Sequence, residues 1–322
     1  MSGSRVLVTG ASGFVGSHLR DALRARGHLV RGTTRDAARV SGATDGTEWV
    51  TLPDLADRDA LARALDGVDA VVHLAARVHV MHEVAADPLA EFRRANVAVT
   101  QALAEASRRA GVRRFVYLSS MKVHGEEGSV PYSERDALAP EDPYGRSKVE
   151  SEQAVEAALG DAVGWTILRP PLIYGARVGG NFRRLLWLAG LSRRVPLPLG
   201  GIRNQRSLLY VGSLVDAIIG GIETADPVGR AFVISDGESL STSDLVRRLA
   251  RALGGGMPML PCPVPLLQGT LRMLGREAEG HRLFGSFLVD SSALRRVRGW
   301  TPPFTVDEGL RATADWWRTQ AR

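Results

Sequence analysis

The first 120 residues alternate short runs of β-branched residues with segments of helical periodicity, and this alternation constrains the fold more than any other feature. It predicts strands at Arg5–Thr9, Leu29–Thr33, Ala70–Leu74 and Arg114–Ser119, separated by helices at 13–26, 58–65 and 90–110. Strands joined by helical crossovers pair in parallel, because each crossover returns the chain to the same end of the sheet. The alternation therefore predicts a parallel α/β sheet that binds ligands beyond the carboxyl ends of its strands.

The rest of the chain divides into segments that continue this pattern and segments that do not. A helix at 142–159, a strand at 165–168, a helix at 211–222 and a strand at 231–234 continue it. Residues 179–206 and 239–300 instead mix short helices with proline and glycine turns. We therefore expect a Rossmann-type, doubly wound parallel sheet over residues 1–178, to which 207–236 return, and a smaller, mostly C-terminal substrate-binding lobe made of 179–206 and 237–322.

Composition is that of an ordinary globular protein. Apolar residues make up 44% of the 322 residues and charged residues 24%, and no stretch approaches the roughly 18 uninterrupted apolar residues of a membrane span. The N-terminal residues lead straight into the first strand without the pattern of a signal peptide. The single cysteine, Cys262, allows no internal disulfide and suits a reducing compartment, so we expect a cytoplasmic protein.

The formal net charge of +6 raises the question of an acidic partner. Basic residues alternate with Asp and Glu instead of forming tracts, which argues against nucleic acid and favours anionic small molecules. Only two of the 41 basic residues, Lys122 and Lys148, are lysines. Because the chain otherwise uses arginine, we expect each lysine to have a role that arginine does not fill. His79 and His82 have the spacing of helical metal ligands but lack the further ligands of a site, so we expect no metal.

Three glycines, Gly10, Gly13 and Gly16, lie between the first strand and the first helix. Glycine permits a tight turn and a close approach of the backbone to a ligand, and the helix N-terminus offers N–H groups and a partial positive charge to a pyrophosphate. A glycine triplet alone is a weak signal and could be a structural turn. Its place after the first strand of a strand–helix series predicts a dinucleotide site.

The residue after the second strand distinguishes NAD from NADP. A carboxylate there binds the 2′-hydroxyl of the NAD ribose, whereas a cationic side chain accommodates the 2′-phosphate of NADP. Arg35 occupies this place with no acidic residue before it, which favours NADP(H) over NAD(H). The alternative is that Arg35 is a surface charge and that Asp36 reaches the ribose.

Tyr144 and Lys148 lie four residues apart in the helix that Pro143 begins, so their side chains share one face. A phenol with its ordinary pKa of about 10 is a poor acid–base catalyst at neutral pH, and a nearby ammonium favours the phenolate. Ser120 follows a predicted strand at its carboxyl end, where a hydroxyl can hydrogen-bond a reacting carbonyl oxygen. Together the three residues predict proton transfer beside the dinucleotide.

These segments resemble the extended short-chain dehydrogenase/reductases. The resemblance is carried by Thr9–Gly16, Asp54–Leu55, His73–Ala76, Asn96, Ser119–Gly125, Tyr144–Lys148 and Arg169–Gly175, which span most of the first 175 residues. It implies that Ser120, Tyr144 and Lys148 form a catalytic triad. His124 departs from the family pattern, which often has tyrosine before this glycine.

The same resemblance implies where the cofactor lies, and it suggests a homodimer. It places Asp54 and Leu55 at the adenine and Asn96 in support of the site. The other implied cofactor contacts are Gly10, Ser12, Gly13, Phe14, Val15, Gly16, Arg35, Leu74, Ala75, Ala76, Ser119, Tyr144, Lys148 and Pro171.

The C-terminal half resembles sugar-nucleotide epimerases and reductases less specifically. Residues 204–217 are similar to the segment whose arginine holds the nucleotide diphosphate, which makes Arg206 the diphosphate candidate, with Asn181 and Arg282 as weaker ones. Arginine suits bidentate phosphate contacts, although each of these residues could equally be a surface residue. Residues 197–200 and 299–303 look most like bacterial reductases of UDP-4-keto-6-deoxy-N-acetylhexosamines.

These resemblances imply an NAD(P)H-dependent reductase of a nucleotide-linked 4-keto sugar, with a UDP-sugar as substrate, in bacterial surface-polysaccharide biosynthesis. Hydride would come from the nicotinamide and the proton from Tyr144. One alternative is an NAD-dependent UDP-sugar 4-epimerase, which uses the same groups; another is a non-catalytic dinucleotide sensor or assembly protein on the same fold. Met121 and Lys122 stand where dehydratases usually carry Asp and Glu, which disfavours dehydration.

Overall fold

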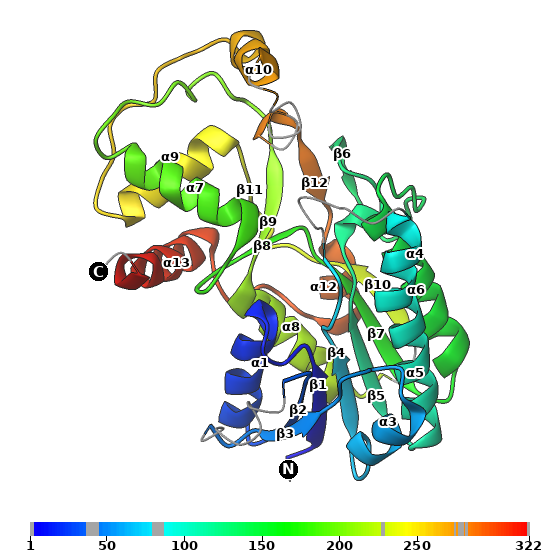
Figure 1. Ribbon diagram of the computed structural model, residues 1–322. Helices are drawn as coiled ribbons and strands as arrows, with labels where there is room; N and C mark the ends of the chain where they lie inside the picture. Colours follow the sequence, from blue (N-terminus) through cyan, green and yellow to red (C-terminus); the bar gives the residue numbers. More distant parts are fainter. Residues whose placement is uncertain are drawn as a thin grey trace.

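A computed structural model describes residues 3–36, 45–78, 87–226, 229–273, 275, 280 and 283–320 (Figure 1). Its centre is a seven-stranded parallel sheet in the order β10-β7-β5-β4-β1-β2-β3. The strands are β1 (Arg5–Thr9), β2 (Leu29–Thr34), β3 (Glu48–Thr51), β4 (Ala70–His73), β5 (Arg114–Leu118), β7 (Gly164–Arg169) and β10 (Arg230–Val233). The chain winds outward from β1 and β4 in opposite directions, which confirms the predicted doubly wound sheet.

Helices cover both faces of this sheet (Figure 1). One face carries α1 (Phe14–Ala25), α8 (Val211–Glu223) and α12 (Ser292–Arg298), and the other carries α3 (Arg58–Ala64), α5 (Val99–Arg109) and α6 (Pro143–Leu159). Alternate side chains of β1 point to the two faces: Val6 and Val8 lie in the core with α1 and α8, and Leu7 lies in the core with α3 and α5. A parallel sheet covered in this way needs apolar residues on both faces.

The first helix shows how local sequence sets its bounds. Val15, Leu19 and Leu23 recur at four-residue intervals and are buried along one stripe against the sheet. The helix ends where Gly27 adopts a left-handed φ of +82°, and the His28 amide donates to the Leu23 carbonyl at 3.0 Å. Gly27 therefore forms a left-handed cap, which turns the chain into β2.

The helix predicted at 90–110 consists of three parts. It contains α4 (Pro88–Phe92), a wider π-helical segment η1 (Arg93–Ala98), and α5. The π-helical segment carries Asn96, whose buried side chain accepts from the Arg77 amide at 2.8 Å and donates to Ser147 Oγ at 3.0 Å. Asn96 thereby ties the loop after β4 to α6, a long-range contact that helical periodicity does not predict.

A smaller lobe stands over the carboxyl ends of the central strands (Figure 1). Its strands are β6 (Gly128–Tyr132), β8 (Leu172–Tyr174), β9 (Arg206–Tyr210), β11 (Ser239–Leu240) and β12 (Phe287–Val289). The helices α7 (Gly180–Leu191), α9 (Thr242–Ala252) and α13 (Val306–Gln320) enclose a third apolar core, and α10 (Val264–Met273) lies at the outer end. None of the helices in the described ranges is long and apolar enough to cross a membrane.

The two units interleave more than the predicted boundaries allow. β6 lies within the predicted first domain, residues 1–178, yet it pairs with β12 in the sheet of the lobe. α12 lies within the predicted lobe segment 237–322, yet Leu294 is buried in the core of the large sheet and Arg298 Nη1 donates to Thr166 Oγ1 at 2.9 Å. Pairing and docking between segments far apart in the chain decide these placements.

Candidate active site

A cavity of about 1660 Å³ lies between the carboxyl ends of the central strands and the lobe. It begins at the turn after β1 and passes the ends of β4 and β5 to side chains of α7 and β9. β1 and β4 are the neighbouring strands from which the chain winds in opposite directions, and such a switch point leaves a crevice between the loops that follow them. The cavity therefore lies where this type of sheet binds its ligands.

The turn after β1 has the geometry of a phosphate site. Gly10 has a left-handed φ of +67°, and a Cβ atom at this position would lie 2.9 Å from the Ala75 amide nitrogen. A Cβ atom on Gly16 would lie 2.3 Å from the Gly10 carbonyl oxygen, so both positions require glycine. No side chain caps α1 at Gly13, which lines the cavity. An uncapped helix N-terminus beside a close-packed glycine turn fits the pyrophosphate of a dinucleotide.

Behind this turn, a buried hydroxyl joins the ends of β1 and β4. The amides of Leu74 and Ala75 donate to Thr9 Oγ1 at 3.2 Å, so the hydroxyl itself donates to His73 Nδ1 at 2.6 Å. Burial, followed by the charge of Lys148, lowers the pKa of His73 to about 3. His73 is therefore a neutral imidazole at neutral pH, and its hydrogen bond with Thr9 links it to the loop after β4.

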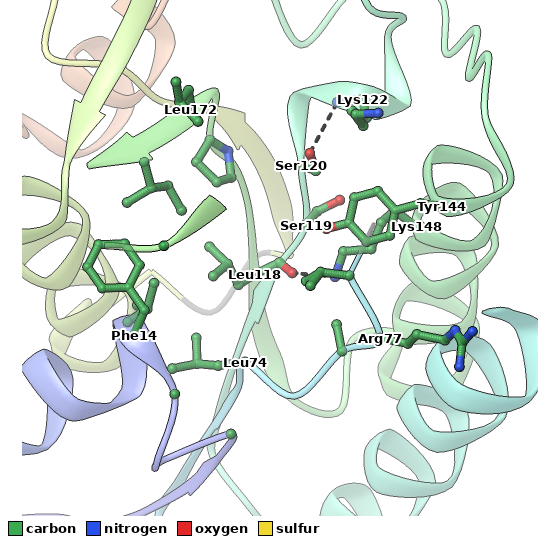
Figure 2. Close-up of a pocket in the computed structure, with 18 of the residues that line it drawn as sticks. Phe14, Leu74, Arg77, Leu118, Ser119, Ser120, Lys122, Tyr144, Lys148 and Leu172 are labelled. Carbon is green, nitrogen blue, oxygen red and sulfur yellow. Dashed lines mark hydrogen bonds between the residues drawn. The ribbon is translucent and has the colours of Figure 1, made fainter. Parts of the chain in front are cut away.

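Ser120, Tyr144 and Lys148 line one section of the cavity wall (Figure 2). Ser120 follows β5, and the other two residues project from α6. Asp142 caps α6 by accepting a hydrogen bond from the Gly145 amide at 2.6 Å, so Tyr144 lies in the first turn of the helix and Lys148 in the second. The structure thus brings together the three residues that the sequence predicts to act together.

Two oxygens on β5 hold the ammonium group of Lys148. Its buried Nζ donates to the Leu118 carbonyl at 2.7 Å and to Tyr117 Oη at 2.9 Å. The same Nζ lies 6.0 Å from the centre of the Tyr144 ring. Lys148 and Tyr144 therefore lie side by side at the cavity, as Figure 2 shows.

Burial and charge act in opposite directions on the phenol. Burial raises the pKa of Tyr144 above its ordinary value, whereas the Lys148 charge and a hydrogen bond with Ser120 lower it, and burial prevails. Burial also lowers the pKa of Lys148, against the attraction of Tyr144. The effect that the sequence predicts for Lys148 is present, but helical spacing could not indicate the larger effect of burial.

Sequence reasoning missed a buried ionic network behind the triad. Glu152, one helical turn beyond Lys148, accepts from Arg169 Nε at 3.0 Å and from Arg169 Nη2 at 2.6 Å, and Ser119 Oγ also donates to it. His124 Nε2 lies 3.2 Å from Arg169 Nη1, so the residue that departs from the family pattern belongs to this network. The one sequence feature that points to this network is the four-residue interval from Lys148 to Glu152, which places the two side chains on the same face of the helix.

The cavity wall contains most of the predicted site residues. They are Gly10, Ser12, Gly13, Phe14, Val15, Gly16, Arg35, Asp54, Leu55, Leu74, Ala75, Ala76, Ser119, Ser120, Tyr144, Lys148, Pro171, Asn181 and Arg206. Asn96 is not among the residues that line the cavity: its side chain binds Arg77 and Ser147, so it supports the loop after β4. Arg282, His79 and His82 lie outside the described residues. Within the described ranges, no group of three or more His, Cys, Asp or Glu side chains could hold a metal ion.

The wall also contains polar and aromatic residues that sequence reasoning did not assign to it. They include Arg77, Lys122, Glu126, Arg184 and Trp187. Of these residues, the sequence singles out Lys122 alone, because it is one of only two lysines in the chain. The others reach the cavity from loops and from a lobe helix whose placement depends on tertiary contacts.

Known proteins share this sequence pattern and fold. A family profile described as "NAD dependent epimerase/dehydratase family" matches residues 6–235. A Vibrio cholerae protein named UDP-glucose 4-epimerase is 37% identical over 313 residues, which cover 96% of this chain and 94% of the relative. A Mycobacterium tuberculosis protein named 3 beta-hydroxysteroid dehydrogenase/Delta 5-->4-isomerase is 30% identical over 335 residues, which cover 95% of this chain and 88% of the relative.

A solved structure shows the same similarity in three dimensions. It is described as MoeE5 in complex with UDP-glucuronic acid and NAD, and it matches with a TM-score of 0.75 at 27% identity, over 98% of this chain and 99% of that one. The similarity therefore covers both the sheet and the lobe. Since the two relatives above are named for a sugar nucleotide and a steroid, the fold alone does not choose the substrate.

Proposed function

Because the chain belongs to the NAD dependent epimerase/dehydratase family, a family of enzymes, we propose that it is a UDP-sugar 4-epimerase. The observation that carries the proposal is the one cavity that joins the glycine turn, the wall of Ser120, Tyr144 and Lys148, and Arg206 of the lobe. The relative named UDP-glucose 4-epimerase is more similar to this chain, at 37% identity, than the relative named for a steroid, at 30%. This difference favours a sugar nucleotide as substrate.

The residues of the glycine turn fit the dinucleotide that the family binds. Gly10, Gly13 and the first turn of α1 would hold the pyrophosphate, and Asp54 and Leu55 would border the adenine. A bound nicotinamide supplies reversible acceptance and return of hydrogen at carbon. The Thr9 hydroxyl, which accepts from the amides of Leu74 and Ala75, holds the loop after β4 beside this site.

The residues of the triad would move the proton of the C4 hydroxyl. Tyr144 takes this proton as the hydroxyl becomes a ketone and returns it when the ketone is reduced on the other face. Ser120 hydrogen-bonds the C4 oxygen, and Lys148 stabilises the phenolate from its fixed place beside Leu118 and Tyr117. The proton from oxygen and the hydride from carbon both return to the sugar, so the product is an isomer of the substrate.

Arg206 is the proposed contact for the diphosphate of the substrate. It borders the cavity from β9, and its Nη1 donates to the Gly285 carbonyl at 3.2 Å, which orients the guanidinium. Burial lowers the pKa of Arg206, but a guanidinium stays charged at neutral pH. Asn181 borders the same cavity from α7 and adds an amide donor. The complex of MoeE5 with UDP-glucuronic acid supports a uridine diphosphate ligand.

The first prediction concerns turnover without added cofactor. The purified protein, given UDP-glucose or UDP-N-acetylglucosamine, should form the C4 epimer, because an epimerase retains its NAD and regenerates it in each cycle. Proton NMR of the anomeric signals measures the conversion, and NAD released on denaturation gives the bound cofactor per chain. Conversion of 4-keto sugar nucleotides alone, with NADPH consumed in equal amount, would instead identify a reductase. If neither kind of substrate reacts, the proposal of a sugar-nucleotide substrate is wrong.

The 4-keto reductase remains a second candidate because of one side chain. Arg35 follows β2 at the rim of the cavity, where a 2′-phosphate of NADP would need a cation. A reductase must exchange its cofactor in every cycle, and NADPH is the usual cellular reductant. The preference for NADP(H) stays a prediction, and the solved complex with NAD does not support it.

The second prediction tests the role of Arg35 directly. If the chain is the reductase, the wild-type protein should bind NADPH more tightly than NADH, and Arg35→Ala should weaken NADPH binding by roughly 10- to 100-fold while leaving NADH binding unchanged, because one charged hydrogen-bonding partner is lost. Fluorescence titration of both cofactors measures this. Arg63→Ala removes an exposed arginine of α3 that does not border the cavity and should change neither affinity. Equal affinities of the wild type for the two cofactors would contradict the NADP assignment.

A further inference from the structure

Lys122 is one of only two lysines in a chain that otherwise uses arginine for its basic side chains, and like Lys148 it lines the cavity (Figure 2). It lies two residues beyond Ser120, in the short 3-10 turn η2 (Met121–Val123). The proposed proton transfer does not use it. The contacts of Lys122 therefore need their own explanation.

The ammonium group of Lys122 joins two carboxylates. Its Nζ donates to Glu126 Oε1 at 2.6 Å and to Asp142 Oδ2 at 2.5 Å. Burial acts to lower the pKa of Lys122, but the hydrogen bonds to Asp142 and Glu126 outweigh it and raise the pKa overall. Burial acts to raise the pKa of Asp142, but Lys122 and the Gly145 amide prevail and lower it. The pair is therefore ionised at neutral pH.

Asp142 connects this ion pair to the start of α6. One carboxylate oxygen, Oδ1, accepts from the Gly145 amide at 2.6 Å and caps the helix, while Oδ2 accepts from Lys122. The backbone of Lys122 makes two further connections. Its amide donates to Ser120 Oγ at 3.2 Å, and a Cβ atom on Gly145 would lie 2.6 Å from its carbonyl oxygen. Lys122 thus touches both the turn that carries Ser120 and the helical turn that carries Tyr144.

We propose that Lys122 is a positioning residue of the active site, which holds the Ser120 turn against the first turn of α6 and neutralises the Asp142 carboxylate beside Tyr144. The inference rests on the proposed roles of Ser120 and Tyr144 in proton transfer. Without Lys122, the negative charge of Asp142 would act unopposed on the phenolate and disfavour it. Its effect on the reaction is therefore electrostatic as well as geometric.

The charged and aromatic groups that face Tyr144 all remain in the chain when Lys122 is substituted. Lys148 approaches from α6 and Tyr117 from β5, and Asp142 precedes the helix. On the side of α4, the ring of Phe92 contacts Tyr144, and the Arg77 guanidinium lies 5.5 Å from the centre of the Phe92 ring. A change in the Tyr144 titration on removing Lys122 would therefore report the loss of the ion pair.

The test is a pH titration of the Tyr144 phenol with cofactor bound, read as the ultraviolet absorbance difference between each protein and its Tyr144→Phe counterpart. Lys122→Met should raise the midpoint by about one pH unit and lower kcat at neutral pH about tenfold, with recovery at higher pH. Lys122→Arg keeps the charge and should keep the wild-type midpoint. Lys122→Met combined with Asp142→Asn should restore the midpoint, since both charges are removed and Asn caps helices as well as Asp.

Further variants provide a control and define the results that would contradict the proposal. Arg93→Met breaks an exposed ion pair with Glu150 of α6 and should leave the midpoint unchanged. If Lys122→Met does not fold, Asp142→Asn alone should lower the midpoint. An unchanged midpoint in Asp142→Asn or Lys122→Met, or a shift in Lys122→Arg as large as in Lys122→Met, would overturn the proposal. The titration uses no substrate, so it tests Lys122 separately from the proposed function. If the shifts occur as expected but the protein converts no UDP-sugar, the proposed function is wrong and the role of Lys122 is still supported.

Discussion

Replacing Tyr144 by Phe should lower kcat by roughly 100- to 10,000-fold while cofactor binding persists. The substitution removes the hydroxyl that exchanges the proton and keeps the ring, whose centre lies 6.0 Å from that of Phe92. Lys148 should hold its place, because it is bound to Leu118 and Tyr117 and not to Tyr144. Steady-state kinetics and a fluorescence titration of the cofactor on the same preparation measure the two effects.

A matched substitution separates this effect from the general loss of a phenol. Tyr210 packs between Tyr174 and Phe304 and does not border the cavity. Tyr210→Phe should therefore retain kcat within about twofold, since the packed ring is kept and the hydroxyl that is lost does not border the cavity. A Tyr144→Phe protein with near wild-type turnover, or a Tyr210→Phe protein as inactive as Tyr144→Phe, would end the assignment of Tyr144 as the proton-transfer group.

Replacing Glu152 by Ala should destabilise the fold by about 3–5 kcal/mol. Glu152 and Arg169 are 3% and 7% exposed, and their two side chains are paired through both carboxylate oxygens. The substitution would leave a buried guanidinium without its carboxylate, which costs far more than the pair contributes when intact. Thermal unfolding followed by circular dichroism should show a Tm lower by about 4–7 °C.

Glu150 provides the matched control on the same helix. It pairs with Arg93, but the two side chains are 31% and 54% exposed, so Glu150→Ala should cost less than about 1 kcal/mol. The double variant Glu152→Met/Arg169→Met should be more stable than Glu152→Ala, because it removes both buried charges and keeps apolar volume. Equal losses from Glu152→Ala and Glu150→Ala would show that burial does not govern this ion pair.

The elements that local sequence predicts well are those whose causes lie within a few residues. β1 spans Arg5–Thr9 as predicted, and the helix expected at 13–26 spans 14–25. Both depend on a strand or helix period that ends at glycine. The helix with Tyr144 and Lys148 follows equally local causes, a cap at Asp142 and a proline at the first position. These causes also place the glycine turn and the triad at one end of the sheet.

The parts that local sequence did not predict depend on partners far along the chain. The pairing of β6 with β12, the docking of α12 under β10, and the bonds of Asn96 to the loop after β4 join segments that no periodicity relates. Sequence reasoning therefore set the domain boundaries too simply, and it did not predict the contacts through which Asn96 supports the site. It also missed Glu152 as the partner of Arg169.

The sequence by itself determined the parallel sheet, the glycine turn and the shared helix face of Tyr144 and Lys148, because spacing along one strand or one helix is enough to specify each of them. Only the tertiary structure decided how these residues behave. Burial raises the pKa of Tyr144 against Lys148, and it makes His73 neutral. Long-range contacts place Lys122 between Ser120 and α6. The physical reason is that desolvation and ionic contacts depend on distance in space, which a linear pattern does not contain.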